Sequence, residues 1–275
     1  MKVASIQMNV REDKEKNIQK ALKFVDQAAK EGAKLVCLPE YIDYMGPDDK
    51  ELKQKISETI PGPTTNLFSE KAKELGIYIN CGSFMEKADD GRSYNTSVLF
   101  NDQGEIIATY RKMHLYDVEM EDRISIKESD AIKPGTELSV VDTPVGKMGL
   151  SICYDVRFPE LYRSLALQGA QIMFIPAAFP IYTGYLHWEL LIRARAVENQ
   201  CYVIATGQYG FYDTGEGVED AKYGSSMIVD PWGTVIARAP EGEGIITADI
   251  DITKVDEFRN TIPCFEHRKP EYYQL

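Results

Sequence analysis

The sequence of 275 residues predicts an α/β protein whose mixed sheets are covered by helices. Short continuous apolar runs, such as Lys34–Leu38, are typical of strands that are buried on both faces. Stretches with apolar residues at helical spacing, of which Asp13–Lys30 is the clearest, alternate with these runs. Alternating runs joined by turn sequences, as in Ser93–Tyr110, indicate hairpins between them. Because buried strands need cover on both faces, a domain with two such sheets is expected to have four layers.

The first half of the chain contains five expected strands and helices followed by two hairpins. The five are a strand at Val3–Met8, a helix at Asp13–Lys30, a strand at Lys34–Leu38, a helix at about Thr64–Leu75 and a strand at Ile77–Cys81. The hairpins pair Ser93–Phe100 with Glu105–Tyr110 across N-D-Q-G, and Leu138–Val141 with Lys147–Ile152 across T-P-V-G. Gly32 and Gly76 directly follow the two helices, where glycine commonly ends a helix.

The second half continues the alternation of helices and buried strands. We expect helices at Phe158–Gln168 and His187–Asn199, and strands at Gln171–Ile175, Cys201–Thr206, Ser225–Val229, Thr234–Ala237 and Ile245–Ile250. The stretch Asn260–Leu275 has two prolines and little periodicity. Since no segment resembles a linker or a low-complexity region, we expect a single domain over residues 1–275 with a C-terminal tail at about 260–275.

The composition excludes several classes of partner and cofactor. Lys and Arg number 31 against 43 Asp and Glu, so the net charge of −12 argues against nucleic acid or an anionic membrane as partner. The five cysteines are scattered and odd in number, and no C-x-x-C motif is present, so we expect neither a disulfide framework nor a metal site. No signal peptide or transmembrane run is apparent, and we expect a cytoplasmic protein.

The stretch Gly149–Glu160, G-L-S-I-C-Y-D-V-R-F-P-E, contains the first candidate for chemistry. Its apolar run ends at Cys153, and Pro159 is well placed in the first turn of a following helix. A thiol at a strand-to-helix turn lies near exposed backbone N–H groups and the positive helix end, which favour thiolate and could hold an oxyanion. The alternative is that Cys153 is a small buried hydrophobic residue.

Three more residue types suit hydrolysis by a thiol, and each also has an ordinary structural explanation. Glu40 directly follows a buried strand, where a poorly hydrated carboxylate could act as general acid or base or could cap the next turn. Lys112 could stabilise an oxyanion or be a solvated charge beside Arg111. Glu128 lies in a polar loop and by itself is more typical of a surface residue. His114 is a weaker candidate, as the base of a Cys–His pair.

Taken together, these motifs closely resemble the signature of the nitrilase superfamily of carbon–nitrogen hydrolases. The matching stretches, in chain order, are L-P-E, Y-R-K-x-H-L, E-x-x-x-x-x-P-G, G-L-S-I-C-Y-D-x-R-F-P-E, P-A-A-F, T-G-Y-L-H-W, R-A-R-A-V-E-N-Q-C-Y-V and D-P-W-G. The resemblance covers nearly the whole chain. It implies an α-β-β-α sandwich that forms a homodimer or higher homo-oligomer through the helix after Cys153 and the helix at about His187–Asn199, and it implies no metal or organic cofactor.

The resemblance also implies a role for each catalytic candidate. Cys153 is the nucleophile, Glu40 is the general acid and base, and Lys112 stabilises the tetrahedral intermediate. Glu128 supports the lysine and positions the substrate. The backbone N–H of Tyr154 is expected to help Lys112 hold the oxyanion.

The longer motifs most resemble the branch that contains deaminated glutathione amidase and omega-amidase. This branch implies a small primary amide with a carboxylate as substrate, and a cationic or amide-donating pocket near Cys153. Arg157 and the expected loop Phe179–Tyr185, with Phe179 and Thr183, are the candidates to line that pocket, although Arg157 could instead pair with Glu160 or cap the helix. The acidic stretch Tyr209–Tyr223, which we expect to be a loop, departs from the branch pattern and leaves the substrate open.

The sequence leaves two groups of alternative functions open. Within the same enzyme class, the protein could hydrolyse a carbamoyl amine or a nitrile. Outside it, the protein could be a thiol redox sensor or an inactive scaffold, although the presence of Glu40, Lys112 and Cys153 argues against an inactive protein.

Overall fold

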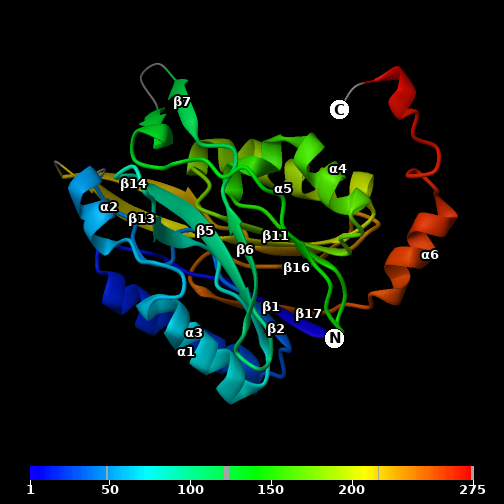
Figure 1. Ribbon diagram of the computed structural model, residues 1–275, viewed down its shortest axis with the longest axis horizontal. Coiled ribbons are helices and arrows are strands. Elements are labelled where there is room, and N and C mark those ends of the chain that lie inside the picture. Colours follow the sequence, from blue (N-terminus) through cyan, green and yellow to red (C-terminus); the bar gives the residue numbers. More distant parts are fainter. Residues whose placement is uncertain (48, 121–123, 216, 274–275) are drawn as a thin grey trace.

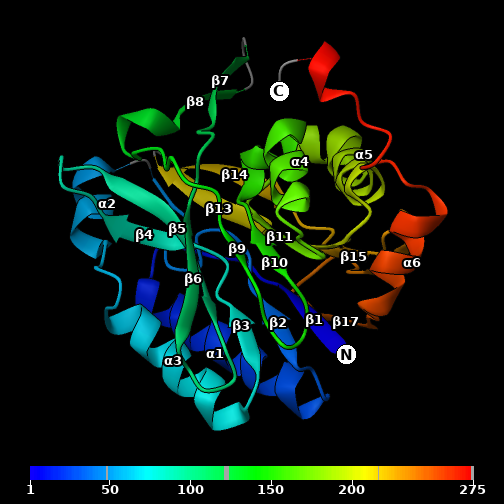
Figure 2. The same ribbon diagram turned by 45° about the vertical axis from the view of Figure 1, so that its right-hand side comes forward.

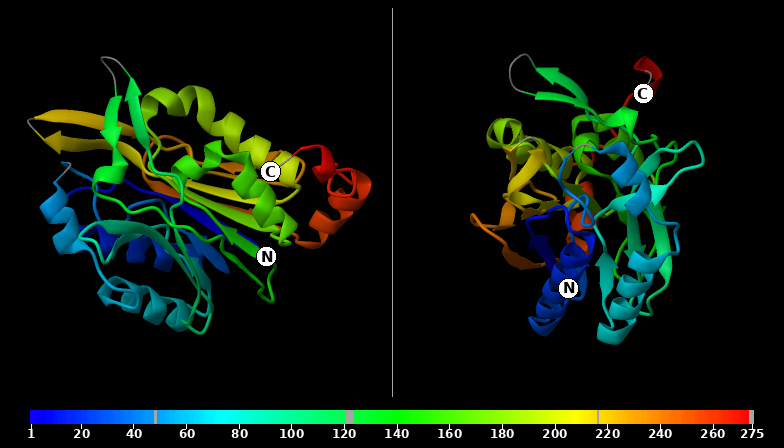
Figure 3. Two further views of the ribbon diagram at one scale, coloured as in Figure 1. Left: turned by 45° about the horizontal axis from the view of Figure 1, so that its top comes forward. Right: turned by 90° about the vertical axis from the view of Figure 1, so that its left-hand side faces the viewer.

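The computed structural model describes residues 1–47, 49–120, 124–215 and 217–273. Two mixed β-sheets lie face to face at the centre, and two helices cover the outer face of each sheet (Figure 1). The same layers are visible from two further directions in Figure 3. The expected four-layer α-β-β-α sandwich is therefore confirmed.

The first sheet comes from the N-terminal half of the chain and one C-terminal strand. Its strands are β1 (Lys2–Gln7), β2 (Leu35–Cys37), β3 (Tyr78–Asn80), β4 (Phe84–Lys87), β5 (Ser93–Phe100), β6 (Ile106–Arg111) and β17 (Gly244–Asp249). The order is β17-β1-β2-β3-β5-β4, with β6 also paired to β5; β1, β2 and β3 are parallel and the other pairs are antiparallel. Helices α1 (Lys14–Lys30) and α3 (Pro63–Leu75) bury their apolar residues against this sheet.

The second sheet comes from the C-terminal half. Its strands are β9 (Val140–Val141), β10 (Met148–Leu150), β11 (Ile172–Ala177), β12 (Tyr202–Gly207), β15 (Met227–Val229) and β16 (Val235–Arg238), in the order β16-β15-β12-β11-β10-β9. The central strands β10, β11 and β12 are parallel, so their carboxyl ends lie at one edge of the sheet. Helices α4 (Pro159–Leu167) and α5 (Ile181–Asn199) cover its outer face.

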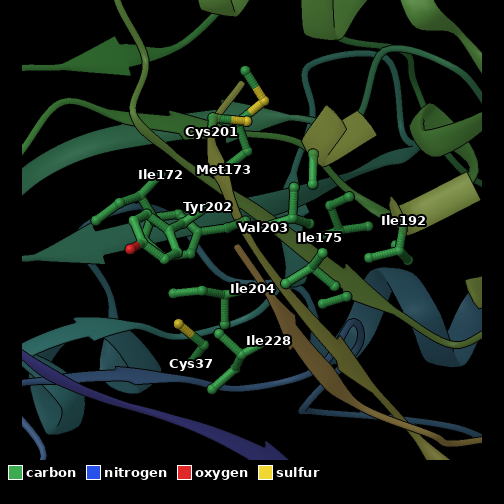
Figure 4. Close-up of a cluster of buried hydrophobic side chains, with 14 of the residues drawn as sticks. Cys37, Ile172, Met173, Ile175, Ile192, Cys201, Tyr202, Val203, Ile204 and Ile228 are labelled. Carbon is green, nitrogen blue, oxygen red and sulfur yellow. The ribbon is translucent and has the colours of Figure 1, made fainter. Parts of the chain in front are cut away.

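A continuous apolar core fills the space between the sheets. Cys37 of β2 lies close to Ile204 of β12 and Ile228 of β15, as Figure 4 shows. The core also contains one polar link, in which the hydroxyl oxygens of Ser5 and Thr206 lie 2.7 Å apart. Buried cysteines such as Cys37 and Cys201 are packed as small apolar residues here, in accord with their burial.

Helix α5 begins six residues before the expected start at His187, so the stretch Phe179–Tyr185 is only partly a loop. Thr183 and Gly184 are weak helix formers, which hid this first turn in the sequence. The structure explains the glycine, because a Cβ atom at Gly184 would lie only 2.3 Å from the ring of Tyr223. Close packing of α5 on Tyr223 therefore decides the local structure.

Several short elements were not expected from the sequence. They are α2 (Lys50–Ile56), β4, the hairpin β7 (Asp117–Met120) and β8 (Ile124–Lys127), and α6 (Thr253–Thr261), which overlaps the start of the expected tail. The hairpin of β7 and β8 projects from the body of the protein (Figure 2). None of the helices in the described residues combines the length and the apolar character that a membrane crossing requires.

The stretch 209–223 is a β-hairpin and not the loop we expected, although Glu216 lies outside the described residues. Strands β13 (Tyr209–Gly215) and β14 (Val218–Tyr223) pair antiparallel and form a small sheet of their own. This hairpin extends at the end of the molecule opposite α6 (Figures 1 and 3). Its many polar and charged residues hid the alternation that predicts a strand.

Candidate active site

The thiol of Cys153 lies at a tight turn beyond the end of β10. The residue begins a short 3₁₀ helix, η2 (Cys153–Arg157), and has a left-handed backbone with φ of 47°. A residue other than glycine adopts this conformation at an energetic cost and needs support from its surroundings. Asp155 gives that support, because its carboxylate accepts hydrogen bonds from the N–H of Ile152 at 2.9 Å and from the hydroxyl of Tyr110 at 2.8 Å.

The structure brings the other three catalytic candidates together from separate parts of the chain. Glu40 follows β2, Lys112 follows β6 and Glu128 follows β8. Lys112 Nζ lies 2.9 Å from Glu40 Oε1 and 2.9 Å from Glu128 Oε2, so one ammonium bridges two carboxylates. Cys153, Glu40, Lys112 and Glu128 all line one cavity.

Further hydrogen bonds hold each carboxylate in place. Glu40 accepts from the backbone N–H of Ala178 at 2.8 Å and from Asn95 Nδ2 at 2.9 Å. Glu128 accepts from the hydroxyl of Tyr41 at 2.7 Å and from the backbone N–H of Tyr116 at 2.6 Å. These four partners were missed in the sequence. The sequence carries no clear signal for any of them, since Asn95 is one of several polar residues in the first half of β5.

The electrostatics fix the charge states of the lysine and of one carboxylate. Burial lowers the pKa of Lys112, but the charges of Glu128 and Glu40 outweigh it and leave this pKa well above its ordinary value. Burial raises the pKa of Glu128, but the charge of Lys112 and the hydrogen bonds from Tyr116 and Tyr41 lower it below the ordinary value. Lys112 is therefore a cation and Glu128 an anion at neutral pH.

The expectation that Cys153 favours the thiolate is wrong for this resting site. Burial and the charge of Glu40 raise the pKa of Cys153 well above its ordinary value, against the opposing charge of Lys112. The desolvation of the sulfur outweighs the helix end that the sequence suggested. The thiol is therefore protonated at rest and needs a base when it attacks.

His114 does not take part in this cluster. Its Nδ1 lies 2.8 Å from Asp155 Oδ1, and its ring stacks on Phe158 at 3.6 Å between centroids. The histidine thus contacts the residue that holds the Cys153 turn. The alternative of a Cys–His pair has no geometric support among the described contacts.

A cavity of about 580 Å³ opens beside Cys153, a size typical of sites for small molecules. Two of the four predicted substrate-binding residues, Tyr154 and Phe179, are among the residues that line it. Arg157 is set back, with its guanidinium 5.2 Å from the centre of the Phe179 ring and its Nη1 3.3 Å from His187 Nδ1. Thr183 is buried, with its hydroxyl 3.5 Å from the carbonyl oxygen of Pro180. Their roles in binding stay predictions.

The hairpin β13–β14 forms another part of the cavity wall. Tyr212, Thr214, Asp220 and Lys222 of this hairpin line the cavity. Among the described residues, we find no cluster of three or more His, Cys, Asp or Glu side chains that could hold a metal ion.

Comparison with known proteins agrees with this geometry. The family model of carbon–nitrogen hydrolases matches residues 2–260. The chain is 43% identical over 276 residues to human deaminated glutathione amidase, covering 98% of this chain and 83% of that protein. It is 41% identical over 274 residues to human omega-amidase NIT2, covering 100% of this chain and 97% of that protein.

Solved structures show the same fold. The NitFhit protein of C. elegans superimposes with a TM-score of 0.91 at 38% identity, over 99% of this chain and 66% of that chain. Nit3 of Saccharomyces cerevisiae, a member of the nitrilase superfamily, superimposes with a TM-score of 0.85 at 36% identity, over 98% of this chain and 96% of that chain. The chain belongs to the carbon–nitrogen hydrolase family of the nitrilase superfamily.

Proposed function

We propose that the protein is an amidase that converts a small carboxylate-bearing primary amide into the acid and ammonia through a cysteine thioester. The observation that carries this proposal is the position of Lys112, held between Glu40 and Glu128 on the wall of the cavity that contains Cys153. The relatives named deaminated glutathione amidase and omega-amidase support a substrate with both an amide and a carboxylate.

In the first half of the reaction, Glu40 accepts the proton of the Cys153 thiol while the sulfur attacks the amide carbonyl carbon. The new C–S bond pushes the π electrons of the carbonyl onto its oxygen. Lys112 and the backbone N–H of Tyr154 hold this oxyanion, and one such donor contributes about 3–4 kcal/mol. Glu40 then gives its proton to the amide nitrogen, the C–N bond breaks, and ammonia leaves a thioester on Cys153.

In the second half, Glu40 takes a proton from water while the oxygen of that water adds to the thioester carbon. The tetrahedral intermediate collapses, the C–S bond breaks, and the sulfur recovers its proton from Glu40. The acid is released, and both residues return to their starting states. One carboxylate serves as base and then as acid in each half, so the mechanism requires no histidine. Glu128 takes no proton and holds Lys112 in position.

The test is hydrolysis of deaminated glutathione, α-ketoglutaramate and an N-carbamoyl amino acid, with intact-protein mass spectrometry to detect the acyl-enzyme. Ammonia is measured for the last two compounds, and the released peptide amine is measured for deaminated glutathione, whose amide nitrogen belongs to a peptide. Wild type should release ammonia or, from deaminated glutathione, the peptide amine, and should show the acyl adduct, whereas Cys153→Ala should do neither, with a loss of at least about 10⁴-fold. Cys264→Ala is the matched control, because Cys264 is exposed and outside the cavity-lining residues.

Equal release by wild type and Cys153→Ala would remove Cys153 from the mechanism. Release of carbon dioxide together with ammonia from the carbamoyl compound would instead identify a carbamoyl-amine hydrolase, and acid from a nitrile would identify a nitrilase. A peroxide-sensitive Cys153 without hydrolysis of any of these compounds would favour a redox sensor.

We further propose that the enzyme is cytoplasmic and that it forms a homodimer. The two copies would pair through α4 and α5. Leu186 and Leu190 of α5 are 71% and 68% exposed and lie one helical turn apart, so they present apolar surface outwards. Leu167 of α4 is also half exposed. Light scattering should find a dimer for wild type, and a monomer after Leu186→Glu with Leu190→Glu. A monomeric wild type would contradict the pairing.

A further inference from the structure

Lys222 lies on the wall of the catalytic cavity in a position that the mechanism above does not use. It belongs to β14, and its backbone forms an isolated antiparallel bridge with Pro180. The next residue, Tyr223, donates its backbone N–H to the carbonyl oxygen of Phe179 at 2.9 Å. Ala178, which directly precedes Phe179, donates its backbone N–H to the carboxylate of Glu40. A short backbone segment therefore attaches the hairpin to the catalytic carboxylate.

The ammonium of Lys222 is buried but only loosely compensated. The residue is 6% exposed, and Nζ donates a hydrogen bond to the hydroxyl of Tyr212 at 3.1 Å. Asp220 Oδ2 lies 3.8 Å from Nζ, beyond hydrogen-bond distance, and instead accepts from the Tyr212 hydroxyl at 2.9 Å. Because an ammonium has three hydrogens to donate, Lys222 has capacity for an anionic ligand.

The charge of Lys222 also lies close to the reacting groups. Burial lowers the pKa of Lys222, while the charges of Asp220, Cys153 and Glu40 raise it and that of Lys112 lowers it. This lysine therefore shares the electrostatic environment of the nucleophile. A carboxylate bound to Lys222 would replace the hydration that burial removes, which is a favourable exchange for both ions.

We propose that Lys222 is the specificity-determining residue that binds the carboxylate of the substrate while Cys153 attacks the amide. This inference rests on the proposed amidase function. Tyr212 holds the ammonium in position, and Asp220 competes with the substrate for its charge. Arg157, the candidate from the sequence, is set back behind Tyr154 and Phe179, whereas Lys222 lines the cavity directly.

The test uses pairs of amides that differ only in the carboxylate: succinamate with butyramide, and glutaramate with pentanamide. In Lys222→Met, kcat/KM for the better carboxylate amide should fall about 30- to 100-fold, mainly through KM, because a charge-assisted hydrogen bond is lost. For its neutral partner the change should stay below about twofold. Lys222→Arg should retain most of the preference for the carboxylate.

A matched control separates this contact from a general loss of positive charge. Lys127→Met removes a cationic side chain from the same cavity lining, but that side chain is 69% exposed and pairs with Asp130. Its effect on the carboxylate amides should be less than about threefold, because exposed charges are screened. Equal losses in Lys222→Met for both members of a substrate pair would overturn the proposal.

Two further measurements keep the result independent of folding and of catalysis. Asp220→Asn removes the competing charge and should lower KM for the carboxylate amide by about threefold without affecting the neutral amide; an unchanged KM would count against Lys222. Calorimetry with glutarate should show binding to Cys153→Ala and none after Lys222→Met is added. If wild type hydrolyses no amide, the proposed function fails, but this binding experiment still decides the role of Lys222.

Discussion

Two buried lysines line the same cavity, and they differ in how completely their ammonium groups are paired with carboxylates. Lys112 contacts two carboxylates at hydrogen-bond distance, each of which has further backbone and side-chain donors. Lys222 has the Tyr212 hydroxyl within that distance and a carboxylate at 3.8 Å. The pKa of Lys112 is accordingly raised, because the two carboxylates outweigh its burial, and the pKa of Lys222 is lowered, because its burial prevails.

The charge of Lys112 is neutralised by residues of the fold itself, whereas the charge of Lys222 is fully paired only when a ligand binds. A buried cation costs several kcal/mol unless partners satisfy it, so an incompletely paired one is retained at the expense of stability. The cluster around Lys112 is complete before substrate arrives, as expected for a preorganised catalytic centre. The pairing of Lys222 is completed only when a carboxylate binds. The predictions below test this contrast, beginning with the largest expected effect.

Lys112→Met should abolish most activity and also destabilise the protein. We expect kcat to fall by at least about 10³-fold, because the oxyanion loses its cationic donor. The free energy of unfolding at pH 7 should fall by about 3–5 kcal/mol, because Glu40 and Glu128 are left as buried carboxylates without their cation. Steady-state kinetics and urea unfolding measure the two effects. Undiminished turnover in a folded variant would remove Lys112 from the mechanism.

Glu128→Gln should weaken catalysis by about 10- to 100-fold with little change in KM. The amide keeps one acceptor oxygen, for either the Tyr41 hydroxyl or the Tyr116 N–H, because these two donate to different carboxylate oxygens. It also loses the negative charge that holds Lys112. Because the folded pKa of Glu128 is lowered, the wild-type carboxylate stabilises the fold above the unfolded pKa of about 4.3 and loses this effect as the pH falls through the folded value. Urea unfolding between pH 3 and about 7 should therefore show a weaker acid dependence in the variant. If the free energy of unfolding changed with pH equally in the variant and in wild type, another carboxylate would cause the acid dependence.

The two lysines should also affect stability with opposite dependence on pH. Because the folded pKa of Lys222 is lowered, the unfolded chain binds more protons between that value and about 10.4, and stability rises with pH in this window. Relative to Lys222→Met, wild type should therefore gain stability as the pH rises towards about 10. The raised pKa of Lys112 predicts the reverse, with its contribution complete below about 10.4 and lost above its folded value. Parallel curves for wild type and Lys222→Met would contradict the incomplete pairing of Lys222.

The same contrast explains how much could be predicted from the sequence. Glu40, Lys112 and Cys153 each follow a strand in a recognisable motif, and the resemblance of these motifs to the family signature predicted that the three meet, although β10 belongs to a different sheet from β2 and β6. The supporting donors could not be predicted, because Ala178 and Tyr116 contribute backbone N–H groups that carry no residue-specific signal. The four layers and the central strands could be predicted from continuous apolar runs, because a strand that is buried on both faces is apolar along its whole length.

The hairpin β13–β14 was misread because its structure depends on tertiary contacts. The stretch is acidic and polar, its strands form a separate two-stranded sheet, and such a hairpin has little stability alone. It is held by the backbone contacts of Tyr223 with Phe179 and of Lys222 with Pro180, and by the packing of Gly184 on Tyr223. Contacts of this kind cannot be predicted from the pattern of the local sequence. The residue that we propose for specificity was therefore hidden in the part of the sequence that deviates from the motifs.

Tyr212→Phe gives the smallest effect and the finest test of the contrast. The hydroxyl of Tyr212 donates to Asp220 and accepts from Lys222, so it keeps the ammonium ordered without neutralising it. Its removal should raise KM for a carboxylate amide by about two- to tenfold, since the net value of one hydrogen bond is about 0.5–1.5 kcal/mol. The kcat and the hydrolysis of the neutral amide should be unchanged, because the Lys112 cluster shares no described hydrogen bond with Tyr212. A fall in kcat for both amides would show that the hairpin supports the catalytic wall and that the two lysines are not separable.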